Sequence, residues 1–375
     1  MYEFNEQTRA LIELVRKIVS DHQTPLEARM LRGEKLTWAH YDPGREAARK
    51  AGLWGLRLPP EFGGMHLSLV DRLAMIEENS KCLAPIRFGG EVPHDMFHLQ
   101  GEQKARYLDP FLQDAKRYSW ALTEPGGGAD PARAVSTCAK WDGESWIITG
   151  SKCWISFFDE ADGVLVFART GKRNDADDIS MFAVERGNPG LIARSVPMLG
   201  GFTTHQLTFD NCRVDDVACI GAEGAGFKHA QKQLSKARFG VGAKALGIAQ
   251  RCYDMMVEHA KQRVVFESAL SDKQAIQSMI VDSWIEIQQQ RLMVYACAEK
   301  DDRGKDTRVE ASVIKMTCTE MVCRVIDRAI QIHGAAGCTY ESPLAHWHDR
   351  QRMSRICEGP TEVHKYRMLA RRLLA

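Results

Sequence analysis

Apolar residues recur at helical spacing along the first part of the chain. Leu11, Val15 and Ile18 fall on one face of a helix, with polar residues between them. Pro-Gly, Pro-Pro and Gly-Gly pairs interrupt this pattern and favour turns. The pattern therefore predicts an N-terminal domain of several short helices over residues 1–118.

The pattern changes to that of strands over residues 119–222. Short runs rich in Ile, Val, Leu and Phe stand between turns rich in Gly, Asn and Asp. Asp142-Gly143 is typical of a hairpin, because Gly readily takes the positive φ of a tight turn. The expected strands are 146–148, 164–167, 181–184 and 206–214. They predict a small central β-barrel or sandwich domain.

Long helical stripes return over residues 223–375. One stripe is formed by Ile276, Ile280 and Ile287. A second is formed by Ile314, Cys318, Val322, Val325 and Ala329. Two long amphipathic helices with a helix on either side predict a C-terminal four-helix bundle. The fold class is therefore α+β, in the order helices, β domain, helical bundle.

Charge and apolar content give no reason to expect nucleic acid or a membrane as a partner. The 50 Lys plus Arg residues nearly balance the 49 Asp plus Glu residues, for a net charge of +1. No apolar stretch is long enough to cross a bilayer. Residues 1–9 mix acidic and basic groups, which indicates no signal peptide. We expect a cytoplasmic protein, or a mitochondrial matrix protein if it is eukaryotic and processed.

The eleven cysteines are scattered and form no C-x-x-C pair. Small buried core residues in a reducing compartment are the favoured interpretation. His346 and His348 have H-x-H spacing, but no third ligand is apparent nearby. No metal site is therefore predicted.

The run 121–130, ALTEPGGGAD, is the first candidate for chemistry. Its three consecutive glycines let backbone N–H groups approach an anion such as a pyrophosphate. Taken alone, such a run is more often a flexible loop. Gly221, Gly224 and Gly226 have the wrong spacing for the dinucleotide fingerprint, so a Rossmann site is not supported.

Two further runs carry candidate side chains. In 150–156, GSKCWIS, Trp154 is suited to stack on a planar cofactor and Ser156 to bond a ring nitrogen, although a strand Trp usually just packs. In 355–364, RICEGPTEVH, Pro360 favours the first turn of a helix, which predicts that Glu358 lies just before one. A loop carboxylate of this kind is normally solvated and inert.

Taken in order and spacing, these runs resemble the acyl-CoA dehydrogenase family, and the resemblance covers nearly the whole chain. The matching segments are 121–130, 150–156, 198–200, 207–211, 221–227, 245–250, 263–266, 331–337 and 358–359. The resemblance implies the acyl-CoA dehydrogenase fold, FAD held between the β domain and the bundle, and a homotetramer built as a pair of dimers. The resemblance outweighs the interpretation of these runs as a flexible loop, a packed Trp and a solvated carboxylate.

The resemblance also implies roles for individual residues. Leu122, Thr123, Gly128 and Ala129 would contact the flavin or its pyrophosphate. Trp154, Ile155 and Ser156 would line the isoalloxazine ring, with Ser156 near N5. Arg263, Phe266, Gln331, Gly334 and Ala335 would reach the cofactor of a neighbouring subunit, and Glu362 would also contact cofactor. Arg238, Gly359 and Ala129 would support or bind substrate.

The implied reaction is dehydrogenation of an acyl-CoA to the trans-2-enoyl-CoA. Glu358 would remove the α-proton while the β-hydrogen leaves as hydride to flavin N5. The forming enolate must be stabilised at the same moment, by a backbone N–H at the base and by the flavin ribityl chain. Bound substrate should raise the pKa of Glu358 and the adjacent helix N-terminus should lower it, and the sequence does not decide between them.

The electron acceptor implied by the family is an electron-transfer flavoprotein, within fatty acid or acyl-CoA metabolism. In some relatives the base lies on the helix that here carries Ser235 and Arg238, but that stretch offers no carboxylate. The open alternatives are an acyl-CoA oxidase, a dehydrogenase of acyl-carrier-protein thioesters, and a catalytically silent flavoprotein that acts as a binding partner.

Several positions depart from the common family pattern. Ala129 replaces a Ser, Ala335 replaces the second Gly of a pair, and Ser235 stands where many straight-chain enzymes have an acidic residue. Pro360 and Glu362 replace a hydroxyl residue and, often, a Gln. These changes bear on the acyl group and on individual contacts more than on the type of reaction.

Overall fold

The computed structural model describes residues 2–89, 92–171 and 178–374, without the side chains of residues 94, 95, 232, 233, 235 and 236. The chain forms two compact units. The helical unit comprises Met1–Leu56, Met65–Phe88 and Ser235–Ala375, and the β unit comprises Arg57–Gly64 and Gly89–Leu234. The expected order of helices, β structure and helices is confirmed, whereas the boundaries after residues 118 and 222 stay a prediction.

The N-terminal part of the helical unit consists of short helices. Asn5 caps the first of them, because its side chain accepts a hydrogen bond from the Thr8 N–H at 2.8 Å. Ser68 and Asp71 form a reciprocal capping box at the start of α4. The elements are α1 (Glu6–Ile18), η1 (Val19–Gln23), α2 (Thr24–Leu31), η2 (Trp38–Tyr41), α3 (Asp42–Lys50) and α4 (Leu69–Asn79).

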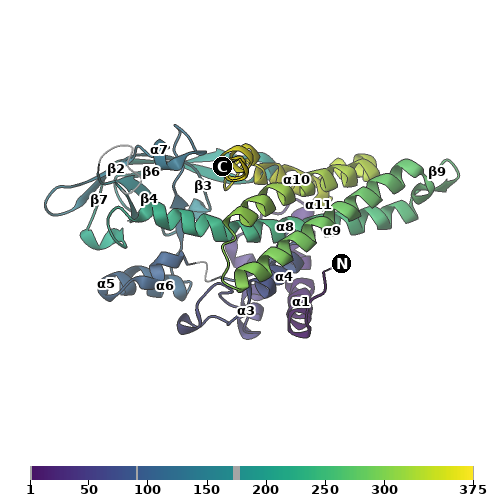
Figure 1. Cartoon of the computed structure of the whole chain (residues 1–375), viewed down its shortest axis with the longest axis horizontal. Helices are drawn as coiled ribbons and strands as arrows, with labels where there is room; N and C mark the ends of the chain where they lie inside the picture. Colours follow the sequence, from purple (N-terminus) through teal and green to yellow (C-terminus); the bar gives the residue numbers. More distant parts are fainter. Residues whose placement is uncertain (1, 90–91, 172–177, 375) are drawn as a thin grey trace. The chain divides into compact units, whose positions relative to one another are not determined.

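The C-terminal part of the chain forms the expected helical bundle, in which α9 and α10 pack along one another (Figure 1). Its elements are α8 (Gly226–Gln262), α9 (Gln274–Asp302), α10 (Arg308–His333), η11 (Gly334–Cys338), α11 (Pro343–Ser354), η12 (Val363–Leu369) and α12 (Ala370–Leu373). The hairpin of β9 (Val264–Val265) and β10 (Ser268–Ala269), followed by η10 (Leu270–Asp272), connects α8 to α9. Residues of α8 before 235 belong to the β unit.

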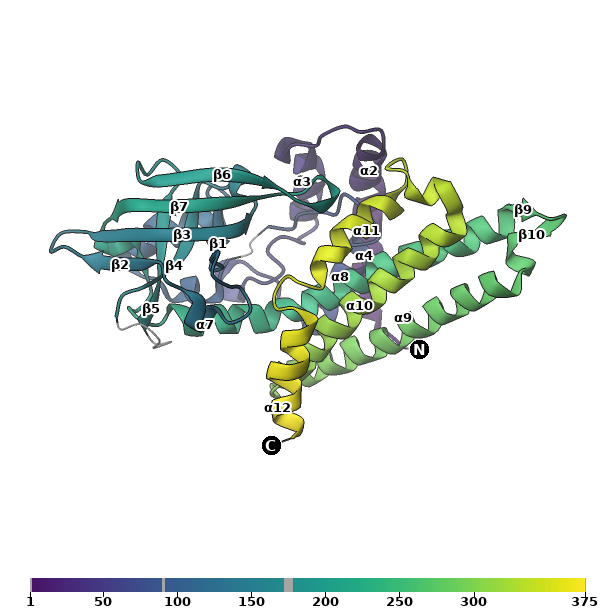
Figure 2. The same cartoon turned by 90° about the horizontal axis from the view of Figure 1, so that it is seen from above.

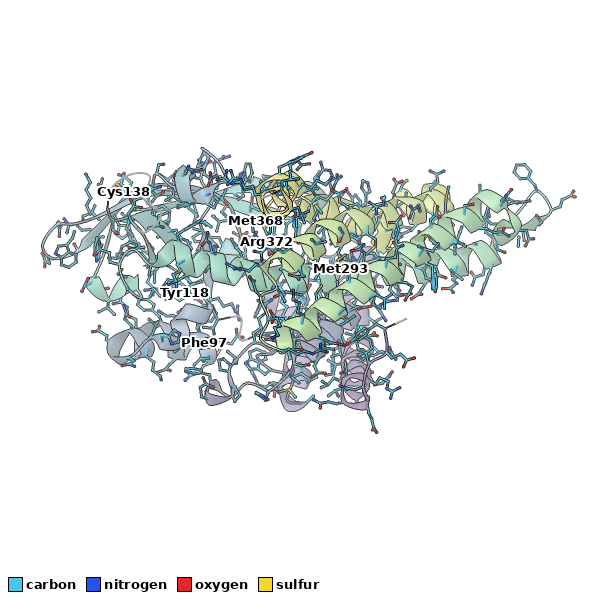
Figure 3. All side chains as sticks on the ribbon, viewed as in Figure 1. Phe97, Tyr118, Cys138, Met293, Met368 and Arg372 are labelled. Atoms are coloured by element: carbon cyan, nitrogen blue, oxygen red, sulfur yellow. The ribbon has the colours of Figure 1, made fainter. Side chains whose placement is uncertain are left out.

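The core of the helical unit lies among these long helices. The predicted α10 stripe is buried at Ile314, Cys318 and Val322, and Ile287 of the α9 stripe is buried with it. Met293 of α9 is partly buried and packs against the same core (Figure 3). Burial of these apolar faces explains why long stripes at helical spacing specify the bundle.

The β unit is built on an eight-stranded sheet with the order β6-β7-β3-β2-β4-β5-β8, and β1 pairs in parallel with β4 (Figure 2). All four expected strands are present and longer than predicted. The strands are β1 (Tyr118–Ala121), β2 (Cys138–Trp141), β3 (Trp146–Ser156), β4 (Gly163–Arg169), β5 (Ile179–Glu185), β6 (Leu191–Pro197), β7 (Thr203–Val214) and β8 (Cys219–Ile220). Strand β6 escaped prediction because it is mostly exposed and lacks an apolar alternation.

Short helical segments flank this sheet in the sequence. They are η3 (Pro60–Phe62), η4 (His94–His98), α5 (Gly101–Gln103), η5 (Lys104–Leu108), α6 (Asp109–Leu112), α7 (Pro131–Ala134), η6 (Phe158–Glu160), η8 (Leu199–Gly201) and η9 (Asp216–Ala218). The predicted turn at Asp142-Gly143 joins β2 to β3, with Gly143 at φ +105°. In the part of the chain that the structure describes, no helix combines the length and apolarity needed to span a bilayer.

All eleven cysteines are free thiols. Six of them are buried, in line with their interpretation as small core residues, whereas Cys338 and Cys357 are exposed. The compartment of the protein stays a prediction.

Candidate active site

The turn after α11 carries Glu358 in an unusual backbone conformation. Glu358 has φ +56° and Gly359 has φ +101°. A helix begins at Thr361, which confirms that Glu358 lies just before a helix, separated from it by Gly359 and Pro360. A left-handed conformation in a non-Gly residue costs on the order of 1–3 kcal/mol and persists only where the surroundings enforce it. A Cβ at position 359 would lie 2.9 Å from His364 Nε2, so this position needs glycine.

Buried groups on both sides hold the backbone of this turn. The Lys315 Nζ donates hydrogen bonds to the carbonyl of Gly359 at 2.5 Å and of Arg355 at 3.3 Å. His364 Nε2 lies 3.3 Å from the Glu358 carbonyl, which requires this nitrogen to carry the proton. The side chains of Lys315 and His364 are fully buried. Hydrogen bonds to the carbonyls of Arg355, Glu358 and Gly359 therefore hold the backbone conformation of this turn.

A second attachment joins the same turn to α10. Glu320 of α10 accepts a hydrogen bond from Thr361 Oγ1 at 2.8 Å and forms an ion pair with Arg355 at 2.8 Å. Burial alone would raise the pKa of Glu320, but these partners lower it. Both ends of the segment 355–361 are thus anchored to one helix.

The electrostatic surroundings of Glu358 are positive. Burial lowers the pKa of Arg238, and the charge of Glu358 opposes this shift. Burial lowers the pKa of Lys315 to about 8, with Cys357 and Glu358 opposing it. The charge of Glu358 stabilises the protonated forms of Arg238 and Lys315, so these two cations in turn favour the ionised form of Glu358. A base that removes a proton must be in this ionised form. Arg238 Nη1 also lies 3.4 Å from Ser312 Oγ.

His364 is expected to make the fold sensitive to acid. Burial and, to a smaller extent, the charges of Arg238 and Lys315 together lower its pKa to about 4. The unfolded chain therefore binds a proton more tightly than the folded one. This contribution to stability is present above about pH 6.5 and is lost as the pH falls towards 4, by up to about 3 kcal/mol. The fall in the unfolding midpoint between these pH values should be smaller in His364→Gln than in wild type, and equal falls would contradict this role.

In the β unit, the structure brings the two cofactor runs together. The Cys153 N–H donates to the Thr123 carbonyl at 2.9 Å. The Lys152 Nζ donates to Glu124 Oε1 at 2.8 Å and to the Leu122 carbonyl at 3.1 Å. The glycine-rich run therefore lies directly against the strand that carries Trp154.

An ion pair between Lys152 and Glu124 stabilises this junction. The two side chains are only 0% and 3% exposed. Glu124 also accepts hydrogen bonds from the N–H and hydroxyl of Ser136 and from the Thr137 N–H. Burial alone would raise the pKa of Glu124, but Lys152 and these donors lower it to about 2. Burial lowers the pKa of Lys152 to about 8, so both groups are mostly charged at neutral pH.

Trp154 lies at an irregularity in β3. The register against β7 shifts between Lys152 and Ile155, so that β3 contains an extra residue there. Such bulges change the direction of a side chain and are frequent beside active sites. Trp154 has φ +61° and is 54% exposed, unusually open for so large an apolar ring. The next residue, Ile155, is buried, and the Ser156 carbonyl accepts a hydrogen bond from Ser119 at 3.0 Å.

These residues fit FAD. An exposed indole beside a half-buried hydroxyl offers a face and a polar edge to a planar ring. A Cβ at Gly128 would lie 3.1 Å from Thr123 Cγ2, whereas one at Gly126 would meet nothing within 4 Å. The glycine-rich run is therefore closely packed against Thr123 at Gly128 and open at Gly126. An open backbone of this kind leaves room for a bound pyrophosphate. Ala129 is exposed beside it.

A third group of predicted residues lies in the helical unit. Arg263 follows α8 and Phe266 lies at the tip of the β9–β10 hairpin, 92% exposed with φ +50°. Gln331, Gly334 and Ala335 lie at the end of α10 and are exposed. The rings of His259 and His333 stack at 4.4 Å and so connect these two segments. The two segments together form an exposed edge that is accessible to another molecule.

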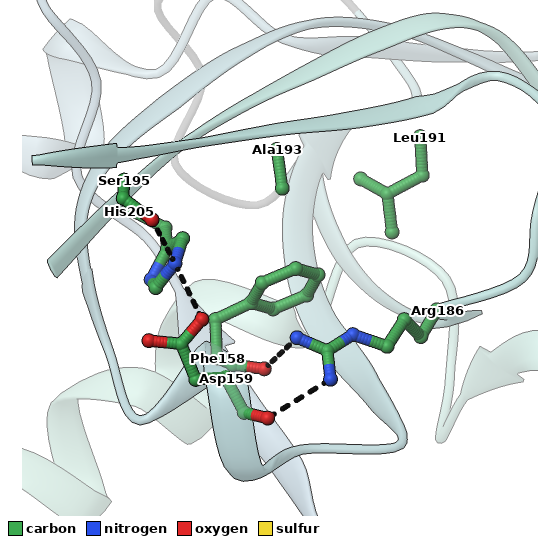
Figure 4. Close-up of a pocket in the computed structure, with 7 residues that line it drawn as sticks. All are labelled: Phe158, Asp159, Arg186, Leu191, Ala193, Ser195 and His205. Atoms are coloured by element: carbon green, nitrogen blue, oxygen red, sulfur yellow. Dashed lines mark hydrogen bonds and ion pairs between the residues drawn. The ribbon is translucent and has the colours of Figure 1, made fainter.

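None of the predicted site residues lines the cavity in Figure 4. Its volume is about 270 Å³, and its lining residues are Phe158, Asp159, Arg186, Leu191, Ala193, Ser195 and His205. His205 Nε2 lies 2.9 Å from Asp159 and 3.1 Å from Ser195 Oγ. Because both contacts use one nitrogen, they do not form the relay of a serine hydrolase, in which the carboxylate and the hydroxyl meet opposite nitrogens.

Sequence reasoning missed Lys152, Glu124, Lys315, Glu320 and His364, which hold the segments that it did identify. Glu124, Lys152 and His364 lie within the three candidate runs, so the sequence draws attention to their positions. Their contacts, however, cannot be inferred from the sequence. Lys315 interrupts an apolar helical stripe, the one sequence signal for a buried charge there. The side chain of Ser235 lies outside those that the structure describes. Glu362 is exposed.

A carboxylate on a strained turn and a glycine-rich run beside an exposed indole are features expected of a flavin-dependent dehydrogenase. The chain matches the family descriptions "Acyl-CoA dehydrogenase, N-terminal domain", "middle domain" and "C-terminal domain" over residues 5–114, 119–212 and 224–374. The chain belongs to the acyl-CoA dehydrogenase family. It is therefore an FAD-dependent oxidoreductase that acts on CH–CH groups.

Individual relatives cover the chain almost completely. The (R)-benzylsuccinyl-CoA dehydrogenase of Thauera aromatica is 31% identical over 100% of this chain and 97% of its own length. The human mitochondrial short-chain specific acyl-CoA dehydrogenase is 31% identical over 97% of this chain and 89% of its own. The structure of butyryl-CoA dehydrogenase from Megasphaera elsdenii matches with a TM-score of 0.88, at 26% identity and 100% coverage of both chains.

Proposed function

We propose that this protein dehydrogenates an acyl-CoA thioester between its α and β carbons, with Glu358 as the base. The observation that carries the proposal is the left-handed turn at Glu358 and Gly359, held by buried Lys315 and His364. Strain that the surroundings enforce on a carboxylate is typical of functional sites. An inert surface carboxylate would need none of these contacts.

Each of these residues would have a distinct role in the reaction. Glu358, whose ionised form is favoured by the charges of Arg238 and Lys315, removes the α-proton of the bound thioester. A backbone N–H in the turn donates to the thioester carbonyl and stabilises the charge that develops on its oxygen. Gly359 leaves this N–H accessible, because it adds no side chain to the turn. The β-hydrogen leaves at the same time as a hydride.

Bound FAD supplies the hydride acceptor. We propose that Trp154, Ile155 and Ser156 hold its ring system and that Leu122, Thr123, Gly128 and Ala129 hold its pyrophosphate. The exposed indole and the open backbone of the glycine run support these roles. Glu362 lies in the helix that follows the turn and is exposed, which is compatible with a cofactor contact.

A visible spectrum and an anaerobic titration test this function. The purified protein should carry flavin absorbance, and this absorbance should bleach with at least one member of a panel of straight, branched, cyclic, aryl and dicarboxylic acyl-CoAs. The bleaching thioester identifies the acyl group. Flavin that bleaches with none of them, nor with the corresponding acyl-carrier-protein thioesters, would favour a silent binding protein.

The electron acceptor is tested on the enzyme reduced in this titration. We propose an electron-transfer flavoprotein, which should reoxidise the reduced enzyme much faster than dissolved oxygen does. Rapid aerobic reoxidation with release of peroxide would identify an oxidase instead.

We also propose that the protein is a homotetramer in which the exposed edge formed by Arg263, Phe266, Gln331, Gly334 and Ala335 contacts the cofactor of a neighbouring subunit. A second surface supports self-association. Helix α9 exposes Val281, Trp284, Ile285 and Leu292, each more than 40% exposed and at helical spacing. Apolar residues gathered in this way on a surface mark an interaction site.

Arg263→Ala is expected to retain less FAD than wild type and to populate smaller oligomers. The reason is the loss of a cationic donor to the cofactor of the neighbouring subunit. Flavin content after gel filtration and the mass by light scattering measure both effects. Lys261→Ala is the matched control, because Lys261 is exposed on the preceding helix and should be neutral. Full flavin occupancy in an unchanged oligomer would contradict the role of Arg263.

A further inference from the structure

Lys315 is a fully buried charged residue of the bundle. It is 0% exposed on α10, next to buried Ile314 and one turn before buried Cys318 and Thr319. Burying an ammonium group is costly unless its donors are satisfied. Burial lowers its pKa to about 8, which reflects that cost. The position would favour a Leu or Met if packing were its only role.

The donors of Lys315 reach both sides of the residue proposed as the base. Its Nζ lies 2.5 Å from the Gly359 carbonyl, directly after Glu358, and 3.3 Å from the Arg355 carbonyl, three residues before Glu358. One ammonium group therefore spans the turn. A compact cation with three donors suits this geometry, and hydrogen bonds from charged donors are about twice as strong as neutral ones.

The other contacts of the turn do not replace this one. Glu320 holds Thr361 and the side chain of Arg355, so it anchors the ends of the segment. His364 contacts the carbonyl of Glu358. The His364 imidazole also interacts with the backbone of Gly359, but its pKa of about 4 leaves it neutral at pH 7, so Lys315 supplies the charged donor to this carbonyl.

We propose that Lys315 is a positioning residue that holds the turn around Glu358, so that the carboxylate is presented to the substrate in one orientation. This inference rests on the proposed function of Glu358. Loss of the Lys315 donors leaves the anchors at Glu320 in place, so the turn stays attached but samples other conformations. A misplacement of about 1 Å at the reacting groups can cost about a hundredfold in rate.

The test compares Lys315→Met with wild type in anaerobic flavin reduction. Met has a similar length and suits a buried site, so the variant is expected to fold and to retain FAD. At saturating concentrations of the thioester that bleaches wild type, its limiting rate of reduction should fall at least about tenfold. The dissociation constant for the matching 2-enoyl thioester should change much less than the rate, because the turn supplies only one of the contacts that bind the thioester.

Lys365→Met is the matched control, since Lys365 is exposed on the helix that follows the same turn. It should reduce at the wild-type rate. An unchanged limiting rate in Lys315→Met overturns the inference and leaves the proposed function intact. Equal losses of rate and of thioester binding would also overturn it, because they indicate general damage to the site.

Amide hydrogen exchange measures the same role without any thioester. Peptides that cover residues 355–362 should exchange faster in Lys315→Met than in wild type, whereas peptides from β3 should not change. Unchanged protection of the turn overturns the inference. A wild-type protein that no thioester reduces would refute the proposed function, while the exchange result would still decide whether Lys315 holds the turn.

Discussion

Glu358→Gln is expected to bind FAD like wild type and to lose at least about a hundredfold in the rate of thioester dehydrogenation, the scale for removal of a positioned base. Gln has the size of Glu and can occupy the same left-handed turn, but its amide cannot accept the α-proton. The effect should therefore appear in the limiting rate of flavin reduction. Binding of the 2-enoyl thioester should change little.

Two comparisons separate loss of the base from damage to the fold. Glu341→Gln removes an exposed carboxylate of the helical unit and should leave the rate unchanged. The thermal midpoint and the flavin content of Glu358→Gln should match those of wild type. Turnover of Glu358→Gln at the wild-type rate would remove Glu358 from the mechanism and require another base.

Lys152→Met is expected to destabilise the protein by about 3–5 kcal/mol, the usual cost of removing one partner from a buried ion pair. Its loss leaves the Glu124 carboxylate buried with neutral donors only. The midpoint of thermal unfolding should fall by several degrees. FAD should also dissociate more readily, because Lys152 connects the glycine-rich run to β3 through Glu124 and the Leu122 carbonyl.

The matched control is Lys140→Met, which removes an exposed lysine from the neighbouring strand β2. The double variant Lys152→Met with Glu124→Gln should recover part of the lost stability, because it removes the uncompensated charge. Glu124 also predicts a dependence on pH. Its stabilising contribution is present above about pH 4.5 and is lost as the pH falls towards 2, where the carboxylate becomes protonated. A Lys152→Met protein as stable as wild type would show that the ion pair is dispensable.

Regular patterns made much of the fold predictable. The stripe of Ile314, Cys318 and Val322 identified α10, because a long helix buries one face continuously. The turn at Asp142-Gly143 identified the hairpin of β2 and β3 for an equally local reason. Strand β6 could not be found in this way, because exposed strands carry no apolar alternation.

The candidate site was predictable only in part. The run that carries Glu358 was found because Pro360 indicates the start of a helix, and the order of the runs indicated the family. The contacts that hold this run come from residues such as Lys315, which lies 44 positions from Gly359 in the sequence. The bulge that exposes Trp154 depends on the register of β3 against β7. Such long-range contacts arise only from the tertiary fold and leave no local pattern.

The most direct test of the central claim is a single anaerobic turnover followed by mass analysis of the thioester. The enzyme is mixed with one equivalent, per flavin, of the acyl-CoA that bleaches it, and both the flavin spectrum and the mass of the thioester are recorded. We predict that loss of flavin absorbance is matched, mole for mole, by a thioester product lacking two hydrogens. Glu358→Gln should show neither flavin bleaching nor product on the same time scale. Bleached flavin with an unchanged thioester, or the same yield and rate from Glu358→Gln, would contradict the account.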